Sequence, residues 1–271
     1  MPASLPEILG ATLRRVHETR RSVNLRQLER AAQAHVPRGF RRALELRSKN
    51  DTAIIAELKK ASPSRGVIRV DFHADALAAE LERSGAAALS VLTDAEFFQG
   101  SLENLQIASR NTKLPCLRKD FILDEIQILE ARANGADAVL LIVAALPQSD
   151  LRDLARRAED SGLNVLCEVH DEGELRRAVD AGCTIIGVNS RDLRTFKVDL
   201  NTAFQLIDKI PKEAVRVAES GIRNGVDIAH LRAAGYQAFL IGESLMAAES
   251  PSEALRALIA ESAAKPVVSL G

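Results

Sequence analysis

Charged side chains recur where short apolar segments of this sequence end. Glu57 and Lys59 end the first such segment, and Lys119, Glu168 and Glu219 end three later ones. A lysine beside carboxylates stays charged and can donate a proton, while a partly buried carboxylate can accept one near neutral pH. The set therefore predicts a pocket for proton transfer. The alternative is a ring of satisfied salt bridges at the mouth of the fold, but burying so many unused charges would be costly.

The apolar segments themselves are candidate strands. They lie near residues 53–58, 87–92, 114–118, 138–143, 164–168, 184–188, 214–218 and 237–241. Their starts are roughly 20 to 35 residues apart, about the size of a strand with its return helix. Most are apolar throughout, as parallel strands covered on both faces should be. Eight such units predict an α/β fold, the (β/α)8 or TIM barrel.

A doubly wound open sheet is the alternative fold. It usually carries a GxGxxG loop after its first strand, and "KKASPSRG" does not fit that pattern. Helix ends support alternating helices and strands in either fold, because a glycine that closes a helix precedes five of the runs: Gly85, Gly135, Gly162, Gly182 and Gly235. Two helix starts have the spacing of capping boxes: Asp124 with Gln127, and Asp171 with Glu174.

The chain before the first strand predicts a helical extension. Leu5–Arg20 and Asn24–Val36 have helical patterns, so we expect residues 1–50 to pack on the barrel rather than form a separate domain. Residues 51–271 then form a single catalytic domain, and the ending "AAKPVVSLG" is typical of a free tail.

Composition restricts the partners of the protein. The net charge is -1 and the pI about 6.6, so no overall basic field predicts nucleic-acid binding. The N-terminus lacks an apolar signal region, and the longest apolar run, residues 138–147, is too short to span a membrane. The number of cysteines is odd (Cys116, Cys167 and Cys183), which favours free thiols in a reducing cytoplasm over disulfides. The histidines are scattered along the sequence, so we predict no metal site.

Barrel enzymes place their active sites where strands end. Since residues two apart on a strand share a face, we expect Ile55, Glu57 and Lys59 to point inward and Lys60 outward. The turns "AESGI" and "LIGESL" follow the last two strands, where barrels often bind phosphate through backbone N–H groups.

Seven segments together resemble the indole-3-glycerol phosphate synthase family of tryptophan biosynthesis. They are "IIAELKKASPSRG", "VLTDAEFFQGS", "LPCLRKDFILDEIQI", "EVHDEGEL", "GVNSRDLRTF", "AESGI" and "LIGESLM". The resemblance covers about residues 5 to 262 and implies a (β/α)8 carboxy-lyase without cofactor or metal. Such an enzyme closes the ring of 1-(2-carboxyphenylamino)-1-deoxyribulose 5-phosphate, and CO2 and water are lost.

The resemblance also implies catalytic roles. Lys119 resembles the general acid that protonates the ribulose carbonyl, and Glu168 the acid/base group of the later dehydration. Lys59 resembles a lysine that contacts phosphate and donates a proton in that step. The remaining residues would orient lysines and substrate: Glu57, Glu219 and Asn189.

Further residues match substrate-binding positions. Arg191 is our candidate for the anthranilate carboxylate, because a guanidinium fork matches a carboxylate. The phosphate loop would comprise Ser220, Gly221, Gly242 and Glu243, and Glu243 would act through its backbone N–H. Four apolar residues would contact the anthranilyl ring of the substrate: Phe98, Phe121, Leu140 and Leu240. Ser62, in the loop after the first strand, would also contact the substrate. We interpret Cys167 and His170 as packing residues.

We therefore expect a small phosphorylated substrate and a cytoplasmic monomer, associated at most weakly with other tryptophan-pathway enzymes. Two alternatives stay open: a non-catalytic relative that binds phosphorylated ligands, and an isomerase of an anthranilyl sugar phosphate.

Overall fold

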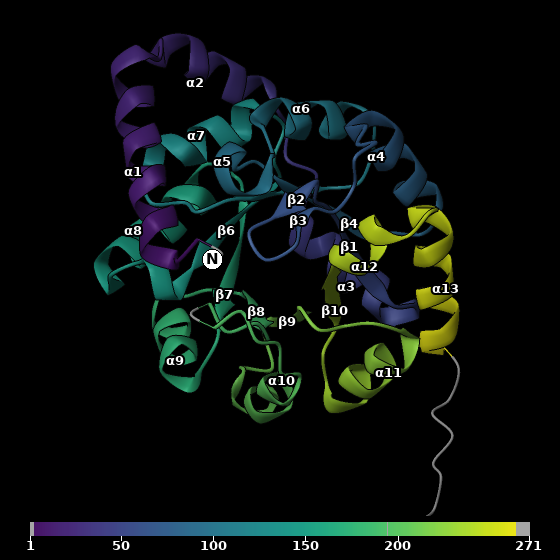
Figure 1. Ribbon diagram of the computed structural model, residues 1–271. Coiled ribbons are helices and arrows are strands. Elements are labelled where there is room, and N and C mark those ends of the chain that lie inside the picture. Colours follow the sequence, from purple (N-terminus) through teal and green to yellow (C-terminus); the bar gives the residue numbers. More distant parts are fainter. Residues whose placement is uncertain (1–2, 194, 264–271) are drawn as a thin grey trace, which may run out of the picture.

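The computed structural model describes residues 3–193 and 195–263, and their centre is a closed barrel of parallel strands (Figure 1). β1 pairs with β4 on one side and with β10 on the other, so the sheet has no free edge. This closure confirms the (β/α)8 barrel and excludes the open sheet. The barrel strands are β1 (Ala53–Leu58), β4 (Ala88–Leu92), β5 (Cys116–Lys119), β6 (Ala138–Ile142), β7 (Asn164–Val169), β8 (Ile185–Asn189), β9 (Val215–Glu219) and β10 (Ala238–Ile241).

Helices surround this barrel (Figure 1). The longer ones are α4 (Ala74–Arg83), α6 (Leu102–Arg110), α7 (Glu125–Ala133), α8 (Gln148–Asp160), α9 (Glu172–Asp180), α10 (Asn201–Leu206), α11 (Gly225–Ala234) and α13 (Pro251–Ala263). Short helices are α5 (Ala95–Phe98), η1 (Val143–Ala145), η2 (Ile207–Lys209) and α12 (Glu243–Ala247). Their apolar faces and the outward faces of the strands form one buried layer, which includes Leu89, Val139 and Cys167. None of the helices in the described parts of the chain is long and apolar enough to cross a membrane.

Two local predictions need correction. The third strand, expected near 114–118, starts at Cys116 and extends to Lys119. Pro115 has no N–H to donate to the sheet, although its carbonyl accepts from the Leu89 N–H. The segment Ser62–Gly66 after β1 has the composition of a loop, so we expected no strand there. It forms a small antiparallel hairpin of β2 (Ala61–Ser62) and β3 (Gly66–Val67).

The helix boundaries follow the predicted signals in most places. All five glycines that were expected to end helices have positive φ, between 71° at Gly162 and 118° at Gly235. The Asp124–Gln127 capping box is present. The Asp171–Glu174 box is only half formed: Asp171 accepts from the Glu174 N–H, but the Glu174 carboxylate binds the N–H of His170 instead of that of Asp171.

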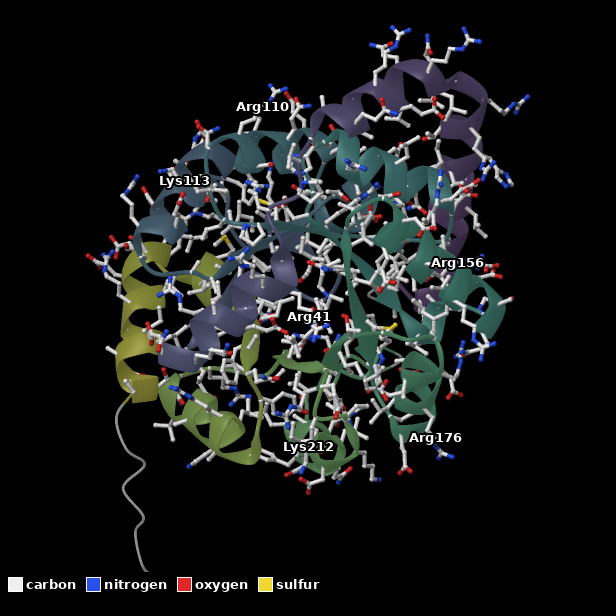
Figure 2. All side chains as sticks on the ribbon, turned by 180° about the vertical axis from the view of Figure 1, so that it is seen from behind. Arg41, Arg110, Lys113, Arg156, Arg176 and Lys212 are labelled. Atoms are coloured by element: carbon white, nitrogen blue, oxygen red, sulfur yellow. The ribbon has the colours of Figure 1, made fainter. Side chains whose placement is uncertain are left out.

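The N-terminal extension has three helices, one more than the sequence patterns separated. They are α1 (Leu5–Ser22), α2 (Leu25–Ala34) and α3 (Phe40–Asn50). α1 and α2 lie against α7, whereas α3 lies across the end of the barrel where the strands begin. Arg41 of α3 lies near the middle of Figure 2, which shows the molecule from behind. Phe40 and Leu44 of α3 are fully buried in the barrel interior. The predicted C-terminal tail lies outside the described residues from residue 264 onward.

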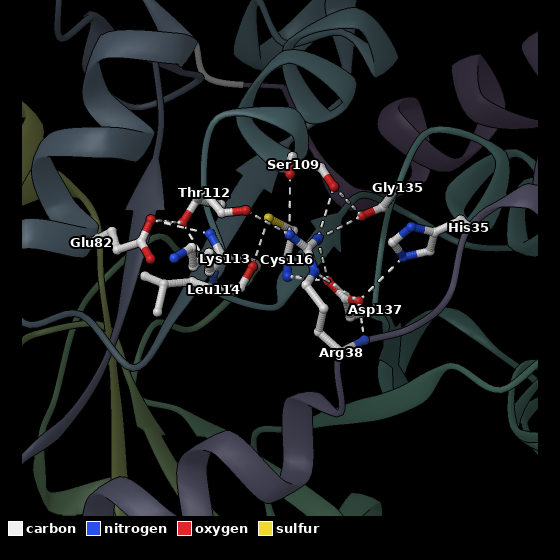
Figure 3. A network of polar contacts seen from close by, with 10 residues as sticks. All are labelled: His35, Arg38, Glu82, Ser109, Thr112, Lys113, Leu114, Cys116, Gly135 and Asp137. Atoms are coloured by element: carbon white, nitrogen blue, oxygen red, sulfur yellow. Dashed lines mark hydrogen bonds and ion pairs between the residues drawn. The ribbon is translucent and has the colours of Figure 1, made fainter.

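A buried polar network holds the connection between α2 and α3 on the barrel (Figure 3). The Asp137 carboxylate accepts from the backbone N–H and guanidinium of Arg38, from the N–H of Cys116 and contacts His35. Arg38 also donates to the carbonyl groups of Ser109 and Gly135. Burial would raise the pKa of Asp137, but the hydrogen bonds from His35 and Arg38 lower it. The network therefore fixes the extension to the barrel through a charged carboxylate.

Candidate active site

Side chains from the strand ends meet in a pocket at one end of the barrel. The inward face of β1 carries apolar residues as far as Ile55 and then Glu57, and β5, β7 and β9 change in the same way. Most of the predicted site residues line this pocket: Glu57, Lys59, Ser62, Phe98, Lys119, Phe121, Leu140, Glu168, Asn189, Arg191, Glu219, Ser220, Leu240 and Glu243. Gly221 and Gly242 line an adjoining hollow that shares Lys59 and Arg191 with it. Lys60 lines neither, as its strand parity predicted.

Lys119 is the centre of this pocket. Its Nζ donates to Glu168 Oε2 at 2.7 Å and to Glu219 Oε2 at 3.1 Å. Burial would lower the pKa of the Lys119 ammonium group, but Glu168 and Glu219, with Glu57, raise it above its usual range. Lys119 is therefore charged at neutral pH, which is the form that a proton donor requires.

The two carboxylates that share Lys119 have different pKa values. Burial would raise the pKa of Glu168, but Lys119 and His170 outweigh burial and lower it to about 2. Burial raises the pKa of Glu219 to about 7 against the attraction of Lys119, and Glu168 adds to the rise. Two carboxylates on one ammonium group titrate as a pair, and Glu168 is the more readily ionised of the two.

Glycines make room for these carboxylates. A Cβ on Gly187 would lie 2.0 Å from Glu219 Oε1, and one on Gly242 would lie 2.4 Å from Glu57 Oε1. Glu57 in turn accepts from Lys59, whose Nζ lies 2.8 Å from its Oε1. The Glu57 and Glu219 carboxylates thus occupy space that these two glycines leave free. Any side chain larger than hydrogen at either glycine would displace the carboxylate next to it.

Asn189, at the end of β8, connects the charged cluster around Lys119 to the next loop. Its side chain lies beside Glu168, whose pKa it lowers, and its Oδ1 accepts from the Arg191 N–H at 3.0 Å. The Arg191 guanidinium contacts Glu243 Oε2 at 3.2 Å, and Arg65 Nη2 contacts Glu243 Oε1 at 2.8 Å. Sequence reasoning missed Arg65, because its contact with Glu243 joins segments that are far apart in the chain.

Apolar side chains form the other side of the pocket. The Phe98 and Phe121 rings lie 6.4 Å apart at 39°, and Leu140 and Leu240 line the pocket with them. Leu5 and Ile8 of α1 also line it, which the sequence did not predict. The same helix is fixed to the β4 loop, because Arg15 Nη2 lies 2.6 Å from the buried Asp94 carboxylate.

Comparison with protein families and sequences identifies this arrangement. The family model described as indole-3-glycerol phosphate synthase matches residues 5–258. The indole-3-glycerol phosphate synthase of Koribacter versatilis (strain Ellin345) is 57% identical over 259 residues, 96% of this chain and 100% of that protein. The chain belongs to the indole-3-glycerol phosphate synthase family.

A second relative agrees. The indole-3-glycerol phosphate synthase of Chlorobium chlorochromatii (strain CaD3) is 50% identical over 217 residues, which are 80% of this chain and 84% of that protein. Membership in the indole-3-glycerol phosphate synthase family makes the chain a carboxy-lyase of tryptophan biosynthesis with a small phosphorylated substrate. The resemblance seen in the sequence is confirmed.

Solved structures of lower identity share the fold. Thiamine phosphate pyrophosphorylase from Pyrococcus furiosus is 19% identical, with a TM-score of 0.59, and covers 80% of this chain and 96% of its own. 3-hexulose-6-phosphate synthase from Salmonella typhimurium is 13% identical, with a TM-score of 0.63, and covers 78% of this chain and 98% of its own. These similarities show the barrel alone.

Cys167 and His170 are both close to Glu168 in the sequence, but one is surrounded by apolar side chains and the other by carboxylates. Cys167 lies in the outer apolar layer, as its parity predicted. His170 does more than pack: its Nδ1 lies 2.9 Å from Glu174 Oε2, and its Nε2 lies 3.5 Å from Glu168 Oε1. Strand parity was the signal that placed His170 on the same side as Glu168. Among the described residues, no cluster of three or more His, Cys, Asp or Glu could hold a metal ion.

Proposed function

We propose that this pocket closes the indole ring of 1-(2-carboxyphenylamino)-1-deoxyribulose 5-phosphate by general acid–base catalysis and forms indole-3-glycerol phosphate. The observation that carries the proposal is the position of Lys119, whose ammonium group contacts both Glu168 and Glu219 at the base of the pocket. A protonated lysine with carboxylates of unequal pKa provides a donor and an acceptor at neutral pH.

Lys119 acts first. Its ammonium group donates a proton to the ribulose carbonyl oxygen as the ring carbon attacks the carbonyl carbon, and the carboxyl group then leaves as CO2. Glu219 holds the lysine through the 3.1 Å contact while the substrate displaces other partners. Because the acceptor oxygen gains negative charge during the attack, a fixed cation beside it lowers the barrier.

Dehydration uses a second donor and acceptor. Glu168, as a carboxylate, accepts a proton from the CH2 carbon of the newly closed ring. Lys59 donates a proton to the hydroxyl group on the adjacent carbon, which leaves as water. Glu57 orients Lys59 through the 2.8 Å ion pair. Asn189, next to Glu168, positions the substrate near these groups.

Substrate binding divides between the two sides of the pocket. The phosphate binds the turns after β9 and β10, at Ser220, Gly221, Gly242 and the N–H of Glu243. Arg191 binds the anthranilate carboxylate. The aromatic ring lies against Phe98 and Phe121, above Leu140 and Leu240, and Ser62 of the β2 hairpin contacts the substrate.

The deciding experiment compares Lys119→Ala with wild type. The sequence has no Trp and one Tyr, so the indole product can be followed by its fluorescence. We expect turnover to fall by at least about 10²-fold, the usual contribution of a general acid, with ligand binding by calorimetry largely retained. Lys113→Ala, an exposed lysine before the same strand, is the control and should keep wild-type turnover.

Either of two results would contradict the proposal. Near wild-type turnover in Lys119→Ala would remove the lysine from the mechanism. Binding without any indole formation in wild type would instead favour the phosphate-binding relative.

We also propose that the enzyme is a cytoplasmic monomer with at most weak association with other tryptophan-pathway enzymes. Residues 51–271 would be its single catalytic domain and residues 1–50 its extension. The three unpaired, buried cysteines are compatible with a reducing compartment. Cell fractionation tests the location, and light scattering at micromolar and higher concentrations tests the oligomeric state.

A further inference from the structure

His170 lies beside Glu168, directly after the end of β7, but has no role in the mechanism above. It follows Glu168 by two residues, and the contact between the two side chains shows that they lie on the same side of the chain. The His170 side chain is largely buried, with 14% of it exposed. A buried imidazole beside a catalytic carboxylate requires an explanation.

The two ring nitrogens of His170 face two carboxylates. Nδ1 lies 2.9 Å from Glu174 Oε2, and Nε2 lies 3.5 Å from Glu168 Oε1. A neutral imidazole has one donor nitrogen and one acceptor, so it would direct a lone pair at one of these carboxylates. Only the imidazolium form suits both. Nε2 is buried and has no hydrogen-bond partner in the described part of the chain. Its 3.5 Å contact with Glu168 Oε1 is an ion-pair contact without hydrogen-bond geometry, so the attraction between the two groups is one of charge.

Glu174 is in place to hold this imidazolium. Its Oε2 accepts from the backbone N–H of His170 at 2.8 Å as well as contacting the ring. This is the contact that leaves the Asp171 capping box half formed. The start of α9 thus gives up one ordinary capping bond, and the released carboxylate fixes both the backbone and the ring of His170.

Glu168 consequently has a cation at each oxygen. Lys119 Nζ binds Oε2 at 2.7 Å, and His170 faces Oε1. We propose that His170, as an imidazolium held by Glu174, is a positioning residue that keeps Glu168 ionised and oriented for dehydration. This inference rests on the proposed function of Glu168.

The charges around His170 support the same assignment. The ionisable groups that act on it are Glu174 from α9, Glu168 from β7 and Glu219 from β9, and all of them are carboxylates. Burial would lower the pKa of His170, but the hydrogen bond to Glu174 and the charge of Glu168 raise it. In return, His170 is one of the two cations that lower the pKa of Glu168.

The test is the pH dependence of kcat in His170→Gln, followed by indole fluorescence. Glu168 and Glu219 titrate as a pair on Lys119, and removing the cation makes this pair easier to protonate. We therefore expect the acidic limb of the kcat profile to move to higher pH by about one unit. We expect kcat at neutral pH to fall by about tenfold through misplacement of the carboxylate, with KM nearly unchanged. Glu174→Gln keeps the imidazole but removes its anchor, and should shift the limb in the same direction by less.

His73→Gln is the matched control. His73 also contacts a carboxylate, Asp71, at 2.9 Å, but its side chain is 70% exposed and lies outside the pocket. It should leave kcat and the pH profile as in wild type. Circular dichroism of each variant shows whether it is folded, and Glu174→Gln supplies the measurement if His170→Gln does not fold.

The outcomes separate the inference from the proposed function. Wild-type activity that Glu168→Gln abolishes establishes the role of Glu168. If His170→Gln and Glu174→Gln then keep the wild-type pH profile, whatever their kcat, His170 is a packing residue and the inference is wrong. If wild type makes no indole, the proposed function itself fails.

Discussion

At the scale of single residues, the site places charges where a stable core would have none. Glu219 is buried, its Oε1 has no hydrogen-bond partner in the described parts of the chain, and a glycine is needed to make room for it. Under the proposed mechanism, such a residue serves catalysis at a cost in stability. The cost can be measured because it depends on pH.

Glu219→Gln should remove this cost. Burial raises the pKa of Glu219 to about 7, above the ordinary 4.5, so folding favours the protonated form. The stabilisation is complete below the ordinary pKa and is lost as pH rises through the folded value. We therefore expect Glu219→Gln to be more stable than wild type at pH 8.5 and close to it at pH 5, in urea unfolding, although its turnover falls. The exposed Glu253→Gln is the control, and a stability gap that does not change with pH would contradict the argument.

Arg191 offers a residue-scale test of substrate binding. A guanidinium group binds a carboxylate through two parallel N–H bonds, which a lysine ammonium group cannot reproduce. Arg191→Lys should raise KM by about tenfold, equivalent to about 1.4 kcal/mol, with a smaller change in kcat. Steady-state kinetics measures both constants. Arg156→Lys, an exposed arginine on α8, should change neither, and an unchanged KM in Arg191→Lys would remove Arg191 from substrate binding.

At the scale of elements, the register of the paired strands determines which charged side chains lie next to each other. β8 pairs with β9 so that Asn189 lies opposite Glu219, and with β7 so that Gly187 lies opposite Glu168. Gly187→Ala would place a methyl group against the Glu219 carboxylate. Because the clash is with the end of a flexible side chain, we expect stability to change little and kcat to fall by about tenfold or more through misplacement.

Gly182→Ala is the control for Gly187→Ala, because it should change stability and not kcat. A Cβ at Gly182 meets no atom within 4 Å, but φ there is +81°, which strains any residue with a side chain. We expect it to lower the unfolding free energy by about 1 kcal/mol and to leave kcat unchanged. The pair is measured by kinetics and urea unfolding, and a loss of kcat in both variants would show that the effect is not specific to the pocket.

The attachment of the extension gives a further element-scale prediction. Asp137→Asn breaks the buried contact with Arg38 in Figure 3 and should lower the unfolding free energy by about 3–5 kcal/mol at pH 7. The pKa of Asp137 is lowered in the fold, so its contribution is complete above the ordinary value of 3.8 and is lost as pH falls further. Chemical unfolding of both proteins at pH 7 and pH 3 should show the gap closing. Asp153→Asn, at an exposed ion pair, is the control.

The elements also show what a sequence can and cannot indicate. Helix-ending glycines such as Gly162 and apolar runs such as that of β6 are local signals, and they predicted the barrel. Strand parity correctly placed Glu57 and Lys59 in the pocket. Other features depend on segments that are far apart in the chain. They are the contact of Glu243 with Arg65, the position of Leu5 in the pocket and the packing of α3 across one end of the barrel. Local patterns carry no information on such contacts.

At the scale of the whole molecule, the pocket joins nearly every part of the fold. Its walls come from strands all around the barrel, from the β2 hairpin and, through Leu5 and Ile8, from α1 of the extension. A ligand that binds there contacts elements that unfolding would separate. Binding to the folded state alone must therefore stabilise the entire chain.

The product, indole-3-glycerol phosphate, makes this linkage measurable. At 100 times its Kd it should add about 2.7 kcal/mol to the unfolding free energy. For a chain of this size that is a rise in Tm of several degrees, at about 2–4 °C per kcal/mol. Differential scanning calorimetry should show the rise in wild type and largely in Lys119→Ala, because Lys119 is assigned to proton transfer more than to binding. Glycerol at the same concentration lacks the phosphate and the ring and should have no effect. If the product shifted wild type but not Lys119→Ala, the lysine would be a binding residue first, and loss of turnover in that variant could no longer be assigned to proton transfer.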